Sequence, residues 1–383
     1  MLADDAKLWH KLQAKSNLTM GNKTKKVLVA MSGGVDSSIA AYLLKKQGFD
    51  VIGVHFNLWK DEIMDEQTAI ESQKQLQIIT EKLQIPLQIV DFKDSFKQKV
   101  VDYFIDGYKT GITPNPCIEC NKQVKFGLFL DKMNELGADY IATGHYVINK
   151  GKSGKNELWM SKDKKKDQSY FLYTLTQEKL KHIIFPLGEK IKTETRIIAN
   201  EIGLEVLNDQ KESQNICFYS GKTPNDFLER NLPSELFKPG PIITVDGNEI
   251  GKHQGLIKYT IGQRKGIGIG GLKEYEDQQG LSWYVVRIDN ANNALIVGRN
   301  EDLEKNELEV EDVRFIDGLN PQKDTKLTAK IRYLSPAQTA VYKPKGDSNG
   351  TVIFDNPQRA VTPGQSVVFY KGEKVLGGGI IAE

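Results

Sequence analysis

The first 220 residues alternate short, largely apolar runs with longer stretches in which apolar residues recur at helical spacing. Such short runs are typical of parallel strands that are covered on both faces. The runs are Val27–Met31, Val51–Val54, Leu87–Val90 and Tyr140–Ala142. A helical pattern follows the first run and ends near Gly48, and glycine commonly terminates helices. This alternation predicts an α/β fold with a doubly wound parallel sheet.

The pattern changes twice in the rest of the chain. Residues 221–282 are rich in glycine and mixed in character, whereas residues 283–383 contain short alternating runs separated by turn residues. The alternating runs are Trp283–Ile288, Ala294–Val297, Leu327–Tyr333, Thr351–Phe354 and Ser366–Tyr370. They predict a small C-terminal β-barrel, with Gly377–Gly379 as a bend in its last strand. We therefore expect a flexible extension over 1–21, an α/β domain over 22–220, a small central domain over 221–282 and the barrel over 283–383.

The loop after the first predicted strand has the composition of a phosphate-binding loop. Glycines let the backbone approach an anion, and the N–H groups at the start of the next helix point toward it. The candidate residues are Ala30, Met31, Ser32, Gly33, Gly34, Val35, Asp36 and Ser37. The loop has neither the Walker A ending nor the spacing of a dinucleotide fingerprint. Asp36 would repel a bare phosphate, so its carboxylate either holds a bound cation or caps the helix.

Three cysteines in 383 residues are too few for a structural disulfide framework. Cys117 and Cys120 form a C-x-x-C motif after a Pro-Asn-Pro turn, and Cys217 stands alone. Two chemistries fit three thiols. In the first, one cysteine carries a persulfide that attacks an activated carbon, and a second cysteine releases the product by forming a disulfide. In the second, the three thiolates hold an iron-sulfur cluster with one open iron. Structural zinc with His145 as the fourth ligand ranks third, and the residues alone leave these alternatives open.

Composition adds two limits. No run approaches the roughly 18 apolar residues that a membrane helix requires, and the first residues lack the apolar core of a signal peptide. We therefore expect a cytoplasmic protein without a membrane partner. The net charge is only +2, but residues 150–166 form a basic strip, which is either a solvated loop or a phosphate-binding surface.

A series of short motifs, taken in order, resembles the tRNA-specific 2-thiouridylase family of the bacterial MnmA/TrmU type, within the PP-loop ATP pyrophosphatase superfamily. The motifs are Ala30–Ser38, Asn115–Lys122, Lys125–Phe126, Ala142–Tyr146, Lys166–Leu172 and Ile216–Phe218. The resemblance covers nearly the whole chain from about Lys25. It implies a PP-loop catalytic domain over 22–220 with an adenine nucleotide alpha hydrolase-like fold, and ATP and Mg²⁺ as cofactors. The implied enzyme adenylates the O2 of the wobble uridine (position 34) of certain tRNAs and then replaces that oxygen with sulfur.

The resemblance also implies roles for particular residues. For ATP it implies the loop from Ala30 to Ser37 together with Phe56 and Gly144. For catalysis it implies Cys217 as the persulfide carrier and Cys120 as the nucleophile that closes a disulfide with it. For tRNA the implied contacts are Asn115, Pro116 and Cys117 at the target base, and His145, Lys166, Asp167, Gln168, Arg332, Tyr333 and Gln365 elsewhere.

One position departs from the family pattern, because Cys117 stands where many members carry Asp. An unperturbed thiol has a pKa of about 8.5, against about 3.9 for Asp, so it ionises only with help from its neighbours. Because a third thiol is available, we weigh two hypotheses equally: a [4Fe-4S] cluster held by Cys117, Cys120 and Cys217, and the persulfide route.

Partners and alternative functions follow from the same resemblance. It implies tRNAs for Lys, Glu and Gln as substrates, and a cysteine desulfurase or a sulfur-relay protein as the sulfur donor. One alternative is another PP-loop ligase or amidating synthetase, which would require neither Cys120 nor Cys217. The other is a non-catalytic RNA-binding protein, which would release no AMP or pyrophosphate.

Overall fold

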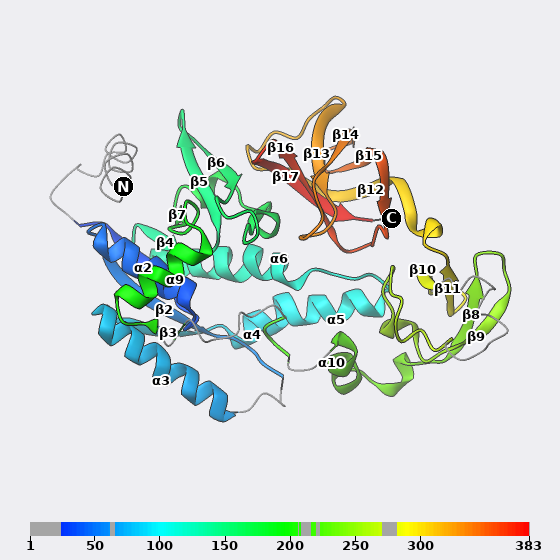
Figure 1. Cartoon of the computed structure of the whole chain (residues 1–383), viewed down its shortest axis with the longest axis horizontal. Helices are drawn as coiled ribbons and strands as arrows, with labels where there is room; N and C mark the ends of the chain where they lie inside the picture. The colour runs from blue at the N-terminus through cyan, green and yellow to red at the C-terminus, as the bar shows by residue number, and fades with distance from the viewer. Residues whose placement is uncertain are drawn as a thin grey trace.

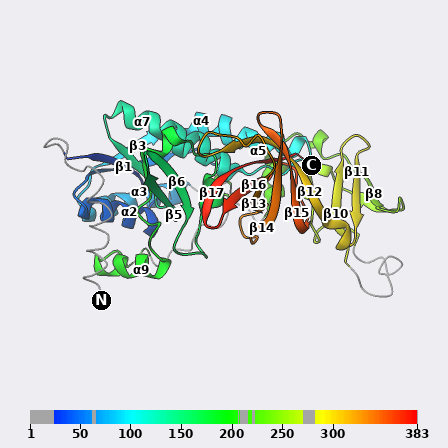
Figure 2. The same ribbon diagram turned by 90° about the horizontal axis from the view of Figure 1, so that it is seen from above.

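The computed structural model describes residues 24–61, 66–205, 207, 216–219, 223–269 and 282–382. The expected extension over 1–21 lies outside these ranges. The α/β part lies at one end of the elongated molecule, a small sheet lies at the other end, and the barrel lies between them (Figure 1). The view from above shows the same order along the long axis (Figure 2).

Within the described ranges, the α/β part contains a five-stranded parallel sheet in the order β3-β2-β1-β4-β7. Its strands are β1 (Lys26–Ala30), β2 (Asp50–Asn57), β3 (Leu87–Asp91), β4 (Tyr140–Ala142) and β7 (Ile183–Ile184). Because successive side chains point to opposite faces, Val27 and Val29 join one apolar cluster and Leu28 joins another. The prediction of a parallel sheet covered on both faces is confirmed.

Helices cover both faces of this sheet. The cluster around Val27 includes side chains of α2 (Val35–Lys46), α3 (Glu66–Leu83) and α9 (Lys192–Glu201). The opposite cluster includes side chains of η2 (Asn121–Leu128) and α7 (Phe129–Glu135). Strand β1 lies between β2 and β4, where the strand order changes direction, and the carboxyl edge at such a point is the usual ligand site of this architecture.

Two helical stretches extend from the sheet toward the rest of the molecule (Figure 1). The first consists of α4 (Lys93–Phe96), η1 (Lys97–Val101) and α5 (Asp102–Lys109). The second begins with α6 (Pro116–Cys120) and continues through η2 into α7. Segments η1 and η2 are π-helical, a form that often occurs at functional sites. No helix in the described part of the chain is both long enough and apolar enough to cross a membrane.

A hairpin connects the α/β part to the barrel. Its strands are β5 (Val147–Lys152) and β6 (Lys155–Met160), and Trp159 of β6 pairs with Lys374 of the barrel. Two short helices, η3 (Ser169–Leu172) and α8 (Gln177–Leu180), follow the hairpin before the chain returns to β7.

The small sheet is mixed, as expected for the central part. It has the order β10-β11-β8-β9, and its β11–β8 pair is parallel. Its elements, with the helices beside them, are α10 (Pro224–Asn231), η5 (Ser234–Leu236), β8 (Gly240–Thr244), β9 (Glu249–His253), η6 (Leu256–Lys258), β10 (Tyr284–Asp289) and β11 (Ala294–Gly298).

The C-terminal part is a closed barrel, as predicted, but it begins later in the chain than the pattern indicated. Two runs predicted for it, Trp283–Ile288 and Ala294–Val297, provide β10 and β11 of the small sheet instead, because β11 pairs with β8. After η7 (Glu301–Leu303), the barrel strands are β12 (Glu304–Phe315), β13 (Thr325–Lys330), β14 (Gln338–Lys345), β15 (Asn349–Arg359), β16 (Ser366–Lys371) and β17 (Lys374–Ile381). Pairing of β12 with β17 closes the barrel. Strand β13 ends at Lys330, earlier than the pattern predicted, so Arg332 and Tyr333 lie in a turn. Gly377 lies in β17 where a Cβ atom would come within 2.1 Å of the Arg314 carbonyl oxygen.

Candidate active site

The phosphate-loop residues connect β1 to α2 at the carboxyl edge of the sheet. Gly33 has a φ of 85°, a left-handed conformation that favours glycine. The Ser37 hydroxyl holds the loop, because it accepts from the Ser32 N–H at 3.2 Å and donates to the Gly34 carbonyl at 3.0 Å. Helix α2 begins at Val35, so its unpaired N–H groups face the loop. The loop therefore has the backbone geometry of an anion-binding site.

Asp36 has a cationic partner inside the chain. The ammonium of Lys192, the first residue of α9, donates to the two Asp36 carboxylate oxygens at 2.8 and 2.7 Å. The Tyr146 hydroxyl donates to the same carboxylate at 2.8 Å and lies 3.0 Å from Thr195 Oγ1. The cap position of α2 is Gly34, so Asp36 does not cap the helix. The sequence left a bound cation or a cap open, and the structure supplies an ammonium of the protein itself.

Gly144 lies against the start of α2. A Cβ atom at this position would come within 2.8 Å of both the Asp36 carbonyl carbon and the Ser37 amide nitrogen. Such a distance is too short for carbon, so only glycine lets the segment after β4 approach the phosphate loop this closely. The structure thus brings together Gly144 and the loop.

The remaining residues predicted for ATP lie at the ends of β1 and β2. The Met31 N–H, directly after Ala30, donates to the Val54 carbonyl at 2.8 Å, which ties the loop to β2. The Phe56 ring is half-buried and packs against Phe92 and Phe129, with ring centres 5.4 and 4.9 Å apart.

Asn115 and Pro116 determine where α6 begins. Asn115 is its cap residue, and its Oδ1 accepts from the Ile118 N–H at 3.3 Å. Pro116 occupies the first helical position, where its missing N–H costs no hydrogen bond. The helix places Cys117 and Cys120 one turn apart, with Cys117 exposed and Cys120 buried.

The three thiols influence one another electrostatically. Loss of hydration raises the pKa of Cys120 to about 12. Cys117 and Cys217 are exposed as residues, yet loss of hydration at the thiol raises the pKa of each as well. A negative charge on Cys217 raises the pKa of Cys117 further, whereas the Lys125 ammonium lowers the pKa of all three. Cys120 also lies in the same buried apolar cluster as Phe218, so the fold brings the segment of Cys217 to the C-x-x-C motif.

The cysteines are not arranged as a ligand set for a metal. Among the residues that the structure describes, no three or more His, Cys, Asp or Glu side chains are grouped so that they could hold a metal ion. Both the zinc alternative with His145 and the iron-sulfur alternative with three cysteines need such a group. The side chains as placed therefore do not fit either metal centre.

Phe218 anchors the segment that carries Cys217. Its ring is buried, with ring centres 5.5 Å from Phe104 and 5.4 Å from Phe227. Its carbonyl oxygen accepts from the Asp61 N–H at 2.8 Å. These contacts explain why an aromatic residue follows Cys217.

Three residues predicted to contact tRNA have partners inside the protein. Burial lowers the pKa of His145 well below its usual value, the Lys125 charge lowers it further, and the His145 ring lies 2.8 Å from Thr143 Oγ1. Asp167 is buried and accepts from the Ser161 N–H at 2.8 Å, and burial raises its pKa. Gln168 Oε1 accepts from the Tyr146 N–H at 2.9 Å. These contacts hold the loops around the site, and the tRNA contacts of the three residues stay a prediction.

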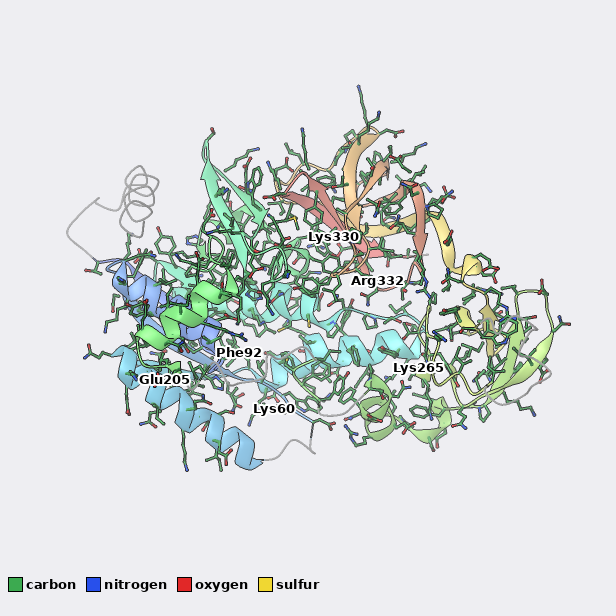
Figure 3. The ribbon with its side chains drawn as sticks, in the orientation of Figure 1. Lys60, Phe92, Glu205, Lys265, Lys330 and Arg332 are labelled. Carbon is green, nitrogen blue, oxygen red and sulfur yellow. The ribbon has the colours of Figure 1, made fainter. Side chains whose placement is uncertain are left out.

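Arg332, Tyr333 and Gln365 come from the barrel. Figure 3 shows Arg332 and Lys330 on the barrel side nearest α6. The Arg332 guanidinium donates to the Arg359 and Ala360 carbonyls, and the Tyr333 ring lies 4.6 Å from that of Phe171.

Gln365 connects the barrel to the segment before α6. Its Nε2 donates to the Thr113 carbonyl at 2.7 Å, and the Thr113 N–H donates to the Pro363 carbonyl at 2.9 Å. The barrel thus holds the segment that leads into Asn115, Pro116 and Cys117.

Part of the basic strip is neutralised within the protein. Lys164 pairs with Glu373 at 2.7 Å and Lys162 with Glu194 at 3.5 Å. The main-chain N–H of Lys166 donates to the Asp163 carbonyl at 3.1 Å, a bond that does not involve the Lys166 ammonium. The strip therefore offers less positive charge than its composition indicates.

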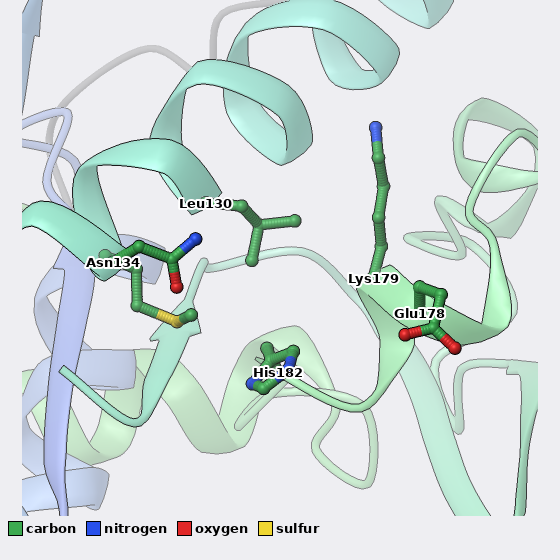
Figure 4. Close-up of a pocket in the computed structure, with 6 residues that line it drawn as sticks. Leu130, Asn134, Glu178, Lys179 and His182 are labelled. Atoms are coloured by element: carbon green, nitrogen blue, oxygen red, sulfur yellow. The ribbon is translucent and has the colours of Figure 1, made fainter. Parts of the chain in front are cut away.

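A hollow of about 240 Å³ lies between α7 and α8, away from these residues (Figure 4). Its walls include Leu130, Asn134, Glu178, Lys179 and His182. None of the residues predicted for ATP, tRNA or catalysis lines it.

Sequence reasoning missed the roles of Lys192, Tyr146 and Lys125. Tyr146 and Lys125 lie inside recognised motifs, but no spacing rule connects either to its partner. Lys192 lies in an otherwise ordinary helix start, 156 residues from Asp36. A solitary lysine at that distance gives no signal in one sequence.

Comparison with known sequences decides the family. Residues 25–221 match the family described as "tRNA methyl transferase HUP domain", 225–299 the "tRNA methyl transferase PRC-barrel domain" and 305–381 the "Aminomethyltransferase beta-barrel domain". The chain is 47% identical over 364 residues to tRNA-specific 2-thiouridylase MnmA 1 of Caldanaerobacter subterraneus subsp. tengcongensis, covering 93% of this chain and 97% of that relative. The chain belongs to the tRNA-specific 2-thiouridylase family. Another 2-thiouridylase, MnmA of Clostridioides difficile, is 44% identical over 363 residues, which cover 93% of this chain and 98% of the relative.

A solved structure gives a weaker likeness to this 2-thiouridylase-family chain. The U34-tRNA thiolase NcsA of Methanococcus maripaludis, solved with its [4Fe-4S] cluster, is 22% identical, with 60% of this chain and 76% of that chain covered. The TM-score is 0.33, too low to carry an argument about the cysteines described above.

Proposed function

We propose that this 2-thiouridylase uses ATP to adenylate the O2 of the wobble uridine of tRNA and then replaces that oxygen with sulfur. One observation carries the proposal. The chain combines an anion-binding loop with a C-x-x-C motif, and Cys120 of that motif lies in the same buried apolar cluster as Phe218, the neighbour of Cys217. An amidating ligase needs the loop but not the thiols, and an RNA-binding protein needs neither.

In the first step, the uridine O2 attacks the α-phosphorus of ATP. The bond between the α- and β-phosphates breaks, and pyrophosphate leaves. The N–H groups at the start of α2 and the loop around Gly33 and Gly34 hold the negative charge of the β- and γ-phosphates. Mg²⁺ would arrive with the triphosphate and neutralise part of its charge.

In the second step, the terminal sulfur of a persulfide on Cys217 attacks C2 of the uridine, and AMP leaves with the original oxygen. The Cys120 thiolate then attacks Cys217 Sγ. The sulfur–sulfur bond of the persulfide breaks, the outer sulfur stays on C2, and a Cys120–Cys217 disulfide forms. A dithiol reductant restores both thiols. Exposure of Cys217 suits loading by a sulfur donor. Burial raises the pKa of Cys120 to about 12 although the Lys125 charge opposes this, so Cys120 must give its proton to a base as it attacks.

Cys117 is auxiliary in this scheme. Its raised pKa keeps it a neutral thiol at physiological pH, so it does not supply the negative charge that an Asp would supply. Because the three cysteines are not placed as a ligand set, no step of the scheme uses an iron-sulfur cluster.

The proposal extends to the partners. The substrates are tRNAs for Lys, Glu and Gln, the sulfur comes from a cysteine desulfurase or a sulfur-relay protein, and the reaction takes place in the cytoplasm, where these tRNAs are used. The residues predicted to bind ATP and tRNA keep those predicted roles as part of this proposal.

Anaerobic thiolation of unmodified tRNA tests the scheme. The assay contains ATP, Mg²⁺ and a sulfur source, and compares iron-free protein with protein reconstituted with iron and sulfide. We expect thiouridine from the iron-free protein, its loss in Cys120→Ser and Cys217→Ser, and its retention in Cys117→Ser. Thiolation only after reconstitution, with loss in all three variants, would establish the cluster instead. AMP release that needs neither Cys120 nor Cys217 would favour a ligase.

A further inference from the structure

The ion pair between Lys192 and Asp36 lies at the phosphate loop. Asp36 is in the first turn of α2, directly before Ser37, whose hydroxyl holds the loop. The Lys192 side chain is 10% exposed and that of Asp36 is 33% exposed, so the carboxylate borders solvent and the ammonium lies behind it. An ammonium this buried is stable only when it is paired.

The backbone around Lys192 is held firmly. The Lys192 N–H donates to Asp163 Oδ2 at 2.9 Å, and the Ile191 N–H donates to Glu194 Oε2 at 2.8 Å. The Tyr146 ring lies under the ammonium, 5.9 Å away, and its hydroxyl shares the Asp36 carboxylate. These contacts aim the lysine at the start of α2.

Charge decides what this arrangement can do. A triphosphate in the loop would bring several negative charges next to Asp36, and an unpaired carboxylate would repel them. If the ion pair only held α2 against α9, its ammonium would not need to lie beside the phosphate loop. A lysine that neutralises Asp36 and also attracts phosphate removes the conflict.

We propose that Lys192 binds the β- and γ-phosphates of ATP and the pyrophosphate that leaves, and that Asp36 and Tyr146 hold its ammonium in position before ATP arrives. The inference rests on the proposed function, because it requires ATP in the loop. It makes Lys192 a substrate-binding residue and Asp36 a positioning residue.

Isothermal titration calorimetry of the whole protein tests this inference without tRNA or thiolation. The ligands are ATP, pyrophosphate and AMP, and the variants are Lys192→Gln, Lys192→Arg, Asp36→Asn and the Asp36→Asn/Lys192→Gln double variant. We expect Lys192→Gln to weaken ATP and pyrophosphate binding about 10- to 100-fold, the range for a charged hydrogen bond, and AMP binding less than about threefold. Lys192→Arg retains most of the affinity.

The double variant separates direct from indirect action. If Lys192 contacts phosphate, Lys192→Gln weakens ATP binding even in the Asp36→Asn background, where no carboxylate needs neutralising. If the effect disappears in that background, Lys192 only neutralises Asp36 and the inference is wrong. Equal weakening of ATP and AMP would likewise assign it a structural role, and the Tm of each variant reports that role independently. Failure of the unaltered protein to bind ATP would instead contradict the proposed function.

Discussion

Replacing Gly144 with alanine tests the close approach between the segment after β4 and the phosphate loop. The new Cβ would lie 2.8 Å from the Asp36 carbonyl carbon and from the Ser37 amide nitrogen. Both atoms belong to the backbone, which cannot rotate away as a side chain can. The two segments must therefore separate by about 0.6 Å to restore ordinary contact.

Overpacking of this kind costs about 1–3 kcal/mol. The atoms displaced are those that begin α2, so the same strain moves the N–H groups that face the proposed phosphates. We expect Gly144→Ala to lower the Tm by several degrees and to weaken ATP binding roughly 5- to 150-fold.

The assay combines thermal unfolding with calorimetric titration of ATP. Gly151→Ala is the matched control, since a Cβ there would meet only Asn156 Oδ1, at 3.7 Å. We expect the control to match the unaltered protein in both measurements. If Gly144→Ala also binds ATP normally with an unchanged Tm, the close approach does not exist. A lowered Tm with normal ATP affinity would remove Gly144 from the ATP site.

Two further predictions concern the thiols and the barrel contact. Burial raises the pKa of Cys120 to about 12, so its thiolate fraction rises about tenfold per pH unit up to that value. Mass spectrometry after iodoacetamide treatment should therefore show labelling of the exposed Cys217 first and of Cys120 only at high pH. Equal labelling rates of the two cysteines at pH 7 would contradict this prediction. Gln365→Ala removes a 2.7 Å hydrogen bond to the Thr113 carbonyl and should lower the free energy of unfolding by about 0.5–1.5 kcal/mol in denaturant titrations. The control is Gln322→Ala at an exposed position, which should leave the free energy of unfolding unchanged. Equal stability of the two variants would refute the contribution of the Gln365 hydrogen bond.

The sequence predicted the architecture because local patterns carry it. The apolar runs indicated strands buried on both faces, and the alternating runs from Leu327 onward indicated the barrel, since side-chain periodicity follows directly from backbone geometry. The two earlier alternating runs were wrongly placed in the barrel, because periodicity does not say which strands pair, and they lie in the small sheet. The sequence also missed the end of β13, where Arg332 and Tyr333 continue the pattern of the strand although the chain has already turned. The Ser335-Pro336 pair that follows is a turn signal, but it lies after Tyr333 and does not mark the residue at which the strand ends.

The sequence by itself also determined the candidate chemistry: a glycine-rich loop before a helix, a C-x-x-C motif and a third cysteine. Only the tertiary structure decided which distant groups act on them. It paired Asp36 with Lys192, packed Phe218 beside Cys120, and turned Asp167 and Gln168 inward. The physical reason is that electrostatic and packing partners depend on distance in space, and one chain read in order records distance only along the backbone.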